Sequence, residues 1–473
     1  MTAYQTGYSR CPDVGRSIGD YTPSSTPELM YLVYSALLLV FFVLRLPSLA
    51  YAAWRHGKAL GNLGERLGRL PVSVNPEHRR SIWIHAVSVG EALASRSLLA
   101  PLRDAYPAHR LVMSTTTATG QAVALGFGTL VDATFYAPLD LPPFVAGTLD
   151  RVAPDLLVVV DTEIWPNLLR ACQRRGVKTV LANGRVSDRS FRGYRVARRL
   201  MRRVLGDLDC ICAQTEPWGR RFLALGAEPD RVTVTGSLKF DTASEAVAAA
   251  DFHVVDRVLA LFRVAEGQAV VIAASTLRGE EEPVLRAFAH VRDRAPNALL
   301  IVAPRHPERF AEAERLASSA GYRVMRRTTM VAGDVLAADV VILDTIGELA
   351  RLYQVASAVF VGGSLVPAGG HNILEPAAFG KAIVFGPHME NFAEIADQFV
   401  AHGAAVRVRT PAALGGAVAD LVDDPVRRAG LGAAARAMVD ANRGATPRTL
   451  AAIAGVLPCG VVPPRTATLR AVR

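Results

Sequence analysis

The stretch Val359–Pro387, VFVGGSLVPAGGHNILEPAAFGKAIVFGP, decides the fold class of this chain. An apolar run ends in Gly362–Ser364, and a second glycine pair, Gly369–Gly370, leads into a short helix predicted to start near Asn372. A further apolar run then follows. Strand, glycine loop, helix and strand in this order predict a βαβ unit in a parallel sheet.

The glycines of this stretch also predict a ligand site. Glycine lets a backbone approach a ligand closely, and the N-terminus of a helix attracts anions. We interpret Gly369 and Gly370 as a phosphate loop and Glu375, one turn into the helix, as a group that binds ribose hydroxyls. A tight βαβ connection without a ligand is the alternative. Neither the dinucleotide fingerprint nor a Walker A loop is present in the sequence.

Composition restricts the class of protein further. The chain has 473 residues, 51% of them hydrophobic and 20% charged, which is enough for two or three domains with large cores. Its formal net charge of +10 favours an anionic partner: anionic lipid, nucleic acid or a phosphorylated substrate. Five cysteines without a Cys-x-x-Cys pair indicate a reducing compartment and no structural zinc. Cys210 and Cys212 lie in an apolar run and are predicted to be core residues.

The N-terminal part predicts a membrane anchor. Residues 1–27 are polar and predicted to be disordered, and 28–56 form the predicted anchor helix, in which Met30–Leu44 carries no charge. The helix either spans the bilayer, with Arg45 reaching toward the interface, or lies partly in one leaflet. A cleaved signal peptide and a buried helix of a soluble protein are less favoured alternatives. The basic residues that follow place the C-terminal body on the cytoplasmic side by the positive-inside rule: Arg55, Lys58, Arg66 and Arg69.

Beyond the anchor, short apolar runs alternate with amphipathic stretches, which predicts two doubly wound, Rossmann-like domains facing a cleft. The first domain is predicted over 57–241, a linker over 242–250, the second domain over 251–457 and a tail over 458–473. The predicted strands of the first domain are Ile82–His85, Leu111–Thr115, Thr134–Ala137, Leu156–Val160, Thr179–Ala182, Cys210–Ala213 and Val232–Thr235. Those of the second domain are Val270–Ala274, Leu299–Ala303, Val340–Leu343, Val359–Val361, Ile383–Phe385 and Val406–Val408.

Two glutamates and a lysine follow strands of the first domain. Glu91 begins a predicted helix beyond the first strand, where a carboxylate is placed to accept a proton. The helix dipole favours its ionised form, so we expect a partly apolar pocket to offset that effect. A helix-capping role fits the same position. Glu163 lies in a second strand-to-helix loop, and Lys239 precedes the domain boundary, where it could stabilise a leaving phosphate.

Charged residues elsewhere give weaker signals. Arg305 follows a strand of the second domain and is a candidate phosphate ligand. The arginine-rich stretch 185–203 favours contact with an anionic membrane or a phosphorylated lipid, although a solvated helix face is the usual explanation. Asp207-Leu208-Asp209 matches the metal motif of some sugar transferases, but it precedes a strand instead of following one. We therefore interpret it as a surface feature and predict no metal.

Several short motifs occur in the order found in one family. The chain resembles the 3-deoxy-D-manno-octulosonic acid (Kdo) transferases of lipopolysaccharide synthesis from the anchor to about Asn391. Each motif is modestly specific, and the ordered set is highly specific. The matching motifs are GNLGERLG (61–68), IHAVSVGE (84–91), TEIWPN (162–167), NGRVSDRS (183–190), SLKFD (237–241), PRHPER (304–309) and GGHNILEP (369–376).

The resemblance implies a GT-B fold and an enzyme without cofactor or metal on the cytoplasmic face of the cell inner membrane. It implies inverting transfer of Kdo from CMP-Kdo to a lipid A precursor, a tetra-acylated disaccharide bisphosphate. It implies that Glu91 is the base and that Glu163 and Lys239 stabilise the transition state. The CMP contacts that it implies are Pro304, Arg305, Ile346, Gly347, Glu348, Asn372, Ile373, Leu374 and Glu375. Ile346 stands where methionine is common in the family.

Two alternatives remain at this point. One is another GT-B transferase that uses a different nucleotide sugar on a membrane lipid. The other is a membrane-tethered nucleic-acid-binding protein, which would explain the charge but would leave both glutamates and the GGHN loop without a role. A dehydrogenase is disfavoured by the missing dinucleotide fingerprint.

Overall fold

The computed structural model describes residues 25–56, 62–248, 262, 264–265, 267–330, 338–345 and 347–458. The chain divides into two compact units, Met1–Lys58 and Ala59–Arg473. The predicted disordered segment 1–27 and the predicted tail 458–473 lie outside the described residues, except for Ser25–Pro27 and Pro458.

The first unit contains one long helix, α1 (Ser25–His56). Its window Glu28–Arg45 is long and apolar enough to cross a membrane, judged by length and composition alone. At 1.5 Å per residue these 18 residues extend over about 27 Å. Core helices of soluble proteins and signal sequences satisfy the same criterion, so this finding alone is weak evidence for an anchor.

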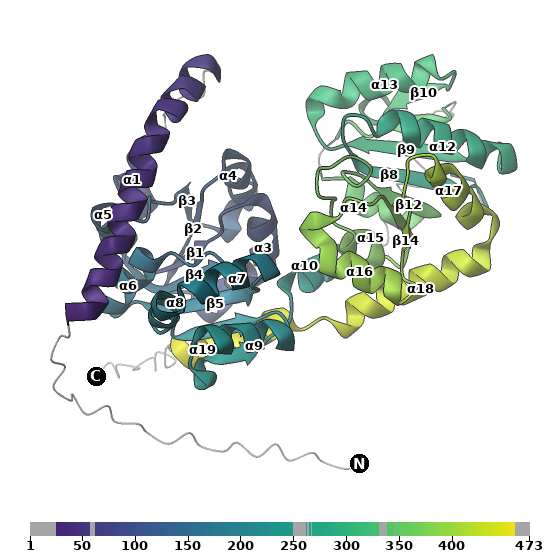
Figure 1. The fold of residues 1–473 in the computed structure, drawn as a ribbon. Coiled ribbons are helices and arrows are strands. Elements are labelled where there is room, and N and C mark those ends of the chain that lie inside the picture. The colour runs from purple at the N-terminus through teal and green to yellow at the C-terminus, as the bar shows by residue number, and fades with distance from the viewer. Residues whose placement is uncertain are drawn as a thin grey trace, which may run out of the picture. The chain divides into compact units, whose positions relative to one another are not determined.

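The second unit contains two parallel sheets of seven strands each (Figure 1). The first sheet has the order β3-β2-β1-β4-β5-β6-β7, so the chain reverses direction across the sheet between β1 and β4. Such a reversal is the switch point at which doubly wound folds bind ligands. Its strands are β1 (Ser81–His85), β2 (Arg110–Thr115), β3 (Ala133–Tyr136), β4 (Pro154–Val160), β5 (Lys178–Gly184), β6 (Cys210–Ala213) and β7 (Val232–Val234).

The second sheet has the order β10-β11-β9-β8-β12-β13-β14, with its switch point between β8 and β12. Its strands are β8 (Val270–Thr276), β9 (Leu299–Pro304), β10 (Val324–Arg326), β11 (Val340–Ile342), β12 (Ala358–Val361), β13 (Ala382–Phe385) and β14 (Val406–Arg407). The central strands of both sheets are buried along their length, because helices cover both faces of a parallel sheet.

Helices connect the strands, as the alternating sequence pattern predicts. The helices that follow α1 and precede the second sheet are α2 (Leu63–Arg66), α3 (Val89–Ala105), α4 (Ala118–Leu125), α5 (Pro142–Val152), α6 (Pro166–Arg174), α7 (Asp188–Val196), α8 (Arg198–Leu205), α9 (Glu216–Leu225) and α10 (Leu238–Ala248). Those that follow are α12 (Glu281–Arg294), α13 (Phe310–Ser319), α14 (Leu349–Leu352), α15 (Leu374–Ala378), α16 (Ala393–Ala401), α17 (Ala413–Asp423), α18 (Pro425–Ala441) and α19 (Ala445–Val456).

The last helix, α19, packs against α3, β5 and β6 of the first sheet (Figure 1, yellow). Its Ala445 and Ile453 are fully buried in the hydrophobic core of that sheet. Asp241 of α10 fixes the start of α19 by accepting hydrogen bonds from the N–H groups of Gly444 (2.7 Å) and Thr446 (2.5 Å). Thus two segments about 200 residues apart in the chain are joined at one carboxylate.

The predicted strands are all present, and the predicted α/β fold with two doubly wound parallel sheets is confirmed. The predicted strand Thr134–Ala137 lies one residue earlier, at Ala133–Tyr136. The sequence missed β10, a three-residue strand at the sheet edge whose residues are only half-buried. An edge strand of this kind lacks the apolar run by which the central strands were found. The predicted core position of Cys210 and Cys212 is also confirmed.

Candidate active site

The first group of candidate residues lies at the switch point of the first sheet. Strands β1 and β4 are hydrogen-bonded neighbours, with His85 opposite Val159. Glu91 follows β1 in the first turn of α3, and Glu163 follows β4 in the loop before α6. The two glutamates predicted from separate motifs therefore emerge from adjacent strand ends, where parallel folds carry their sites.

Glu91 is held by its own loop. One carboxylate oxygen accepts a hydrogen bond from the Val87 N–H (2.6 Å) and the other from the Ser88 hydroxyl (2.8 Å). This is close to a capping-box arrangement, so the carboxylate also serves the start of α3. Burial, followed by the nearby charge of Asp161, nevertheless raises the pKa of Glu91 to about 7. A carboxylate with a pKa near neutrality is suited to accepting a proton.

Glu163 is oriented by an aromatic neighbour. The indole Nε1–H of Trp165 donates to one carboxylate oxygen of Glu163 (3.1 Å). The Trp165 ring meets the fully buried His85 ring edge-on, with centroids 4.5 Å apart. Burial raises the pKa of Glu163, while the bond from Trp165 opposes that shift. Trp165 thus both packs and donates, whereas the sequence indicated packing alone.

Lys239 is the cation of this group. It lies in the first turn of α10, and its ammonium nitrogen is 4.9 Å from the centroid of the Phe392 ring. Burial lowers the pKa of Lys239, and the negative charges of Asp161 and Glu91 oppose that effect. The charges of Glu91, Glu163 and Lys239 are therefore close enough to shift one another's ionisation, directly or through Asp161.

Two buried residues that the sequence did not single out join this group. Asp161 is 6% exposed and follows β4, and Asn183 is fully buried at the end of β5. The Asn183 amide donates to Asp161 and accepts from the N–H of Leu238 (3.0 Å), the first residue of α10. Both residues have left-handed φ angles, +61° and +58°, which is uncommon outside glycine. Arg185 lies 3.4 Å from the second Asp161 oxygen.

The second group of candidate residues follows β12 in the second sheet. Gly362–Ser364, the first glycine loop, does not offer its N–H groups to a ligand in this structure. The fully buried carboxylate of Glu280 accepts from the N–H groups of Gly363 (2.7 Å), Ser364 (3.0 Å) and Leu365 (2.9 Å). The same carboxylate accepts from the Leu277 N–H (2.8 Å). An internal anion therefore occupies this loop.

Gly369 and Gly370, the predicted phosphate loop, both have left-handed φ angles, +88° and +73°. A Cβ at Gly369 would lie 2.4 Å from the Asn391 side chain, and one at Gly370 would lie 2.3 Å from the Met389 sulfur. Close packing within the loop therefore requires both glycines. His371 follows with its Nε2 atom buried and without a partner among the described residues. Burial and the charge of Arg305 lower the His371 pKa to about 4.

Arg305 is close enough to both His371 and Glu375 for its charge to act on them. The Asn372 amide donates to Glu375 (3.1 Å) and accepts from the Leu374 N–H (3.0 Å), which starts the five-residue helix α15 two residues later than predicted. Burial raises the pKa of Glu375, and the Asn372 bond and the Arg305 charge oppose it. The Arg305 side chain is exposed and forms no hydrogen bond or ion pair with the described residues, so its guanidinium is available to an anion. Ile373 and Leu374 are fully buried.

The remaining predicted donor contacts have other neighbours. Pro304 ends β9 and is buried. Gly347 is exposed, with a φ angle of +91°. Glu348 is bound by Arg327 (2.9 Å) and by the Thr345 hydroxyl (2.7 Å), so its side chain is committed within the protein. Ile346 lies outside the described residues.

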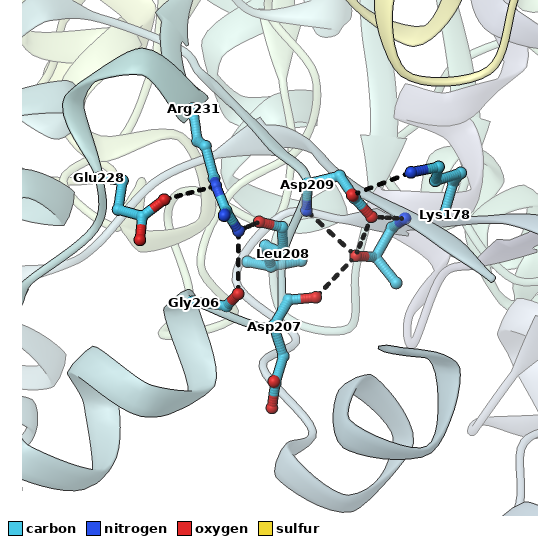
Figure 2. A network of polar contacts seen from close by, with 8 residues as sticks. Lys178, Gly206, Asp207, Leu208, Asp209, Glu228 and Arg231 are labelled. Atoms are coloured by element: carbon cyan, nitrogen blue, oxygen red, sulfur yellow. Dashed lines mark hydrogen bonds and ion pairs between the residues drawn. The ribbon is translucent and has the colours of Figure 1, made fainter. Parts of the chain in front are cut away.

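The Asp207–Asp209 motif has a structural role (Figure 2). Asp209 accepts from the Thr179 N–H (2.9 Å) and lies 3.5 Å from the Lys178 ammonium. Arg231 donates to the carbonyls of Gly206 and Leu208, both at 2.9 Å. Figure 2 shows the Asp207 and Asp209 side chains pointing apart. The motif lies at the amino end of β6, and Asp207 is 5% exposed, so the predicted surface position is wrong for that residue.

Two seven-stranded doubly wound parallel sheets in one chain define the GT-B fold. A crystal structure of a glycosyltransferase from Rickettsia africae matches 80% of this chain and 99% of its own with a TM-score of 0.53; at 11% identity it shows the fold alone. Residues 61–242 match the family model described as 3-Deoxy-D-manno-octulosonic-acid transferase (kdotransferase).

Whole-chain relatives give the same family. A 3-deoxy-D-manno-octulosonic acid transferase from Haemophilus influenzae is 34% identical over 88% of this chain and 96% of the relative. One from Bordetella pertussis is 35% identical over 85% of this chain and 94% of the relative. The chain belongs to the 3-deoxy-D-manno-octulosonic acid transferase family.

Proposed function

We propose that this enzyme transfers Kdo from CMP-Kdo to a tetra-acylated lipid A precursor, with inversion and without a metal, on the cytoplasmic face of the inner membrane. The observation that carries the proposal is the carboxylate of Glu91, whose pKa is raised to about 7 beside Asp161, Glu163 and Lys239. Family membership supports Kdo as the transferred sugar.

The proposed step follows from these charges. The acceptor hydroxyl gives its proton to Glu91 while its oxygen bonds to the anomeric carbon of Kdo. The bond from that carbon to the CMP phosphate breaks, and its electron pair leaves with CMP. Attack opposite the leaving group inverts the anomeric centre. Positive charge that develops on the sugar is stabilised by Glu163, and negative charge on the phosphate by Lys239.

The second sheet would bind the donor. Arg305 offers a guanidinium that forms no hydrogen bond or ion pair with the described residues, and such a group can bind phosphate through two hydrogen bonds. Glu375 and Asn372 offer acceptors and a donor for ribose hydroxyls near that cation. Lys239 in the first group of candidate residues and Arg305 in the second would both be available to the leaving phosphate, in place of a metal.

Exposed basic residues of α7 and α8 support the proposed lipid acceptor and the proposed membrane location. Burial raises the pKa of the Tyr194 phenol in α7, and the nearby charge of Glu163 raises it further. The exposed arginines of α7 and α8 follow along the same segment: Arg189, Arg192, Arg195, Arg198, Arg199 and Arg202. A phosphorylated lipid at an anionic bilayer complements this surface, and α1 would hold the enzyme there.

The test uses the purified full chain in detergent with CMP-Kdo and the tetra-acylated precursor, and mass spectrometry counts the added Kdo residues. We expect transfer that persists in EDTA, and Glu91→Ala that folds and binds CMP but transfers no Kdo. Glu228→Ala, which removes a surface carboxylate paired with Arg231, is the matched control. Near-normal turnover by the Glu91 variant would remove this residue from the proton-accepting role.

A second set of measurements separates the alternatives. CMP should protect the protein from thermal unfolding, and UDP should not. Protection by UDP alone would indicate another GT-B transferase. Salt-sensitive binding to duplex DNA without any effect of CMP would favour a nucleic-acid-binding protein.

A further inference from the structure

A buried amide joins the loop that carries one proposed catalytic residue to the helix that carries another. Asn183 uses both ends of its side chain: its NH2 group donates to Asp161, and its oxygen accepts from the Leu238 N–H at 3.0 Å. Asp161 precedes Glu163 by two residues, and Leu238 directly precedes Lys239. One side chain therefore connects the end of β4 with the start of α10.

The surroundings of Asn183 leave it little freedom. Asn183 is fully buried, and its backbone carbonyl accepts a hydrogen bond from the Gln214 side chain at 2.8 Å. The Asp161 N–H donates to the Ala182 carbonyl (2.9 Å), which ties the β4 end to β5. Asp161 and Asn183 both adopt left-handed backbone angles. Such conformations in non-glycine residues are unfavourable and persist where neighbouring contacts impose them.

We propose that Asn183, with Asp161 as its partner, is a positioning residue that fixes Lys239 relative to Glu91 and Glu163. This inference rests on the proposed function, because those three groups act together only in that reaction. Without the amide, α10 loses the bond at its first residue, and Lys239 loses its fixed distance from the carboxylates. A displacement of about 1 Å in a catalytic group is enough to lower turnover by about 100-fold.

Asp161 adds an electrostatic role to this geometry. Several groups face Glu91: Asp161 and Glu163 from the β4–α6 loop, Lys239 from α10, and the Ser88 hydroxyl and Val87 N–H from its own loop. Arg185 acts on Asp161 and Lys239. The Asp161 charge raises the pKa of Glu91 and also raises that of Lys239 against the effect of burial.

The main test compares Asn183→Ala with Asn75→Ala. Asn75 is also fully buried, and its side chain bonds to Arg79 and to the Val152 carbonyl near the amino ends of the strands, away from the candidate site. Both variants remove a buried bridging amide from the same domain. We expect Asn183→Ala to lower kcat by about 10- to 100-fold with donor KM and CMP affinity within about twofold. Asn75→Ala should keep kcat per folded enzyme. Equal losses in both variants would overturn the inference.

The second variant is Asp161→Asn, which keeps an oxygen for Asn183 to bond but removes the charge. The pKa values of Glu91 and Lys239 should both fall, so both limbs of the pH profile of kcat/KM should move to lower pH, by about 0.5 unit or more. A merely structural loss would lower the profile without moving either limb, and that result would refute the electrostatic role.

Amine labelling provides a readout that does not depend on Kdo transfer. The chain has only four lysines, so the labelling rate of Lys239 can be followed by mass spectrometry against that of Lys178. Asn183→Ala should increase the relative rate at Lys239 by about threefold or more, because α10 is no longer fixed at its start. If Lys239 is labelled faster in Asn183→Ala but the wild-type protein transfers no Kdo, the proposed function is refuted and the positioning of Lys239 by Asn183 is not. An unchanged rate would refute the positioning role.

Discussion

Replacing Glu91 by glutamine tests its proposed role as the base, because the same substitution should lower turnover and raise stability. Burial and the Asp161 charge raise the pKa of Glu91 from 4.5 to about 7. This difference means that ionising the carboxyl costs about 3 kcal/mol more in the folded chain than in the unfolded chain. Glutamine removes that charge at nearly constant shape. The variant should therefore lose turnover, by about 100-fold or more, and gain stability at high pH.

The sign of the stability effect depends on pH. Below about pH 4.5 the carboxyl is neutral in both the folded and the unfolded chain, and the full contribution of the neutral group is present. Between 4.5 and 7 only the unfolded chain ionises, so the free energy of unfolding falls as pH rises. Above about 7 the whole contribution is lost. Glu91→Gln should thus be near neutral at pH 4.5 and most stabilising at pH 8, with 3 kcal/mol as roughly the upper limit.

The assay is urea denaturation of wild type and Glu91→Gln at several pH values between 4.5 and 8.5, together with kcat/KM of the wild type over the same range. The kcat/KM of the wild type should rise with pH up to about 7, where the base becomes ionised. Glu308→Gln, at an exposed position, controls for the loss of one surface carboxylate. The reasoning fails if the glutamine variant is equally stabilised at all pH values, or if wild-type kcat/KM is flat between pH 5.5 and 8.

Four further predictions concern the second sheet. Arg305→Ala should raise the Kd for CMP about tenfold or more with little change in stability, because a charged hydrogen bond to the ligand is lost, whereas the described part of the chain forms no hydrogen bond or ion pair with this side chain. Arg309→Ala, in the same motif, should instead lower stability by about 3–5 kcal/mol in urea denaturation, because it breaks a buried ion pair with Glu281. Glu280→Gln should lower stability by about 2–3 kcal/mol, since an amide NH2 group would face N–H donors. Gly370→Ala should weaken CMP binding measured by calorimetry, because the left-handed φ of this residue and a contact of 2.3 Å between the added Cβ and the Met389 sulfur force the loop to move. Unchanged CMP binding by Arg305→Ala or Gly370→Ala would contradict the prediction for that variant. Wild-type stability of Arg309→Ala or Glu280→Gln would do the same for these two.

The fold could be predicted from sequence because parallel strands buried on both faces leave continuous apolar runs. Leu156–Val160 is such a run, and it is fully buried in β4. The three-residue strand β10, Val-Met-Arg, contains no such run and was missed, although the edge strands β3, β7 and β14 were predicted. The return of α19 to the first sheet is a long-range contact. Its amphipathic pattern marks a helix but does not indicate which of the two sheets receives its apolar face.

The candidate site was predicted only where a motif gave both residue type and position. Glu91 and Glu163 were found because each follows a strand, and strand ends of one parallel sheet meet at one edge. Asp161 and Asn183 were not singled out, although Asp161 directly precedes the TEIWPN motif and Asn183 begins the NGRVSDRS motif. Their importance depends on burial, on left-handed backbone angles and on a bond from Asn183 to a residue 55 positions away. None of these properties has a local sequence pattern.

The glycine loop of β12 shows why a phosphate-binding pattern needs structural context. Gly362–Ser364 after a buried strand satisfies the local requirements of an anion-binding loop. Its N–H groups do bind an anion, but that anion is the Glu280 carboxylate, more than 80 residues earlier in the chain. A donor phosphate could use these N–H groups only by displacing a fully buried carboxylate with four N–H partners. The desolvated carboxylate would then need new partners, which makes this exchange unfavourable. The phosphate-binding proposal is therefore better supported at Arg305 and at the second glycine pair than at the first.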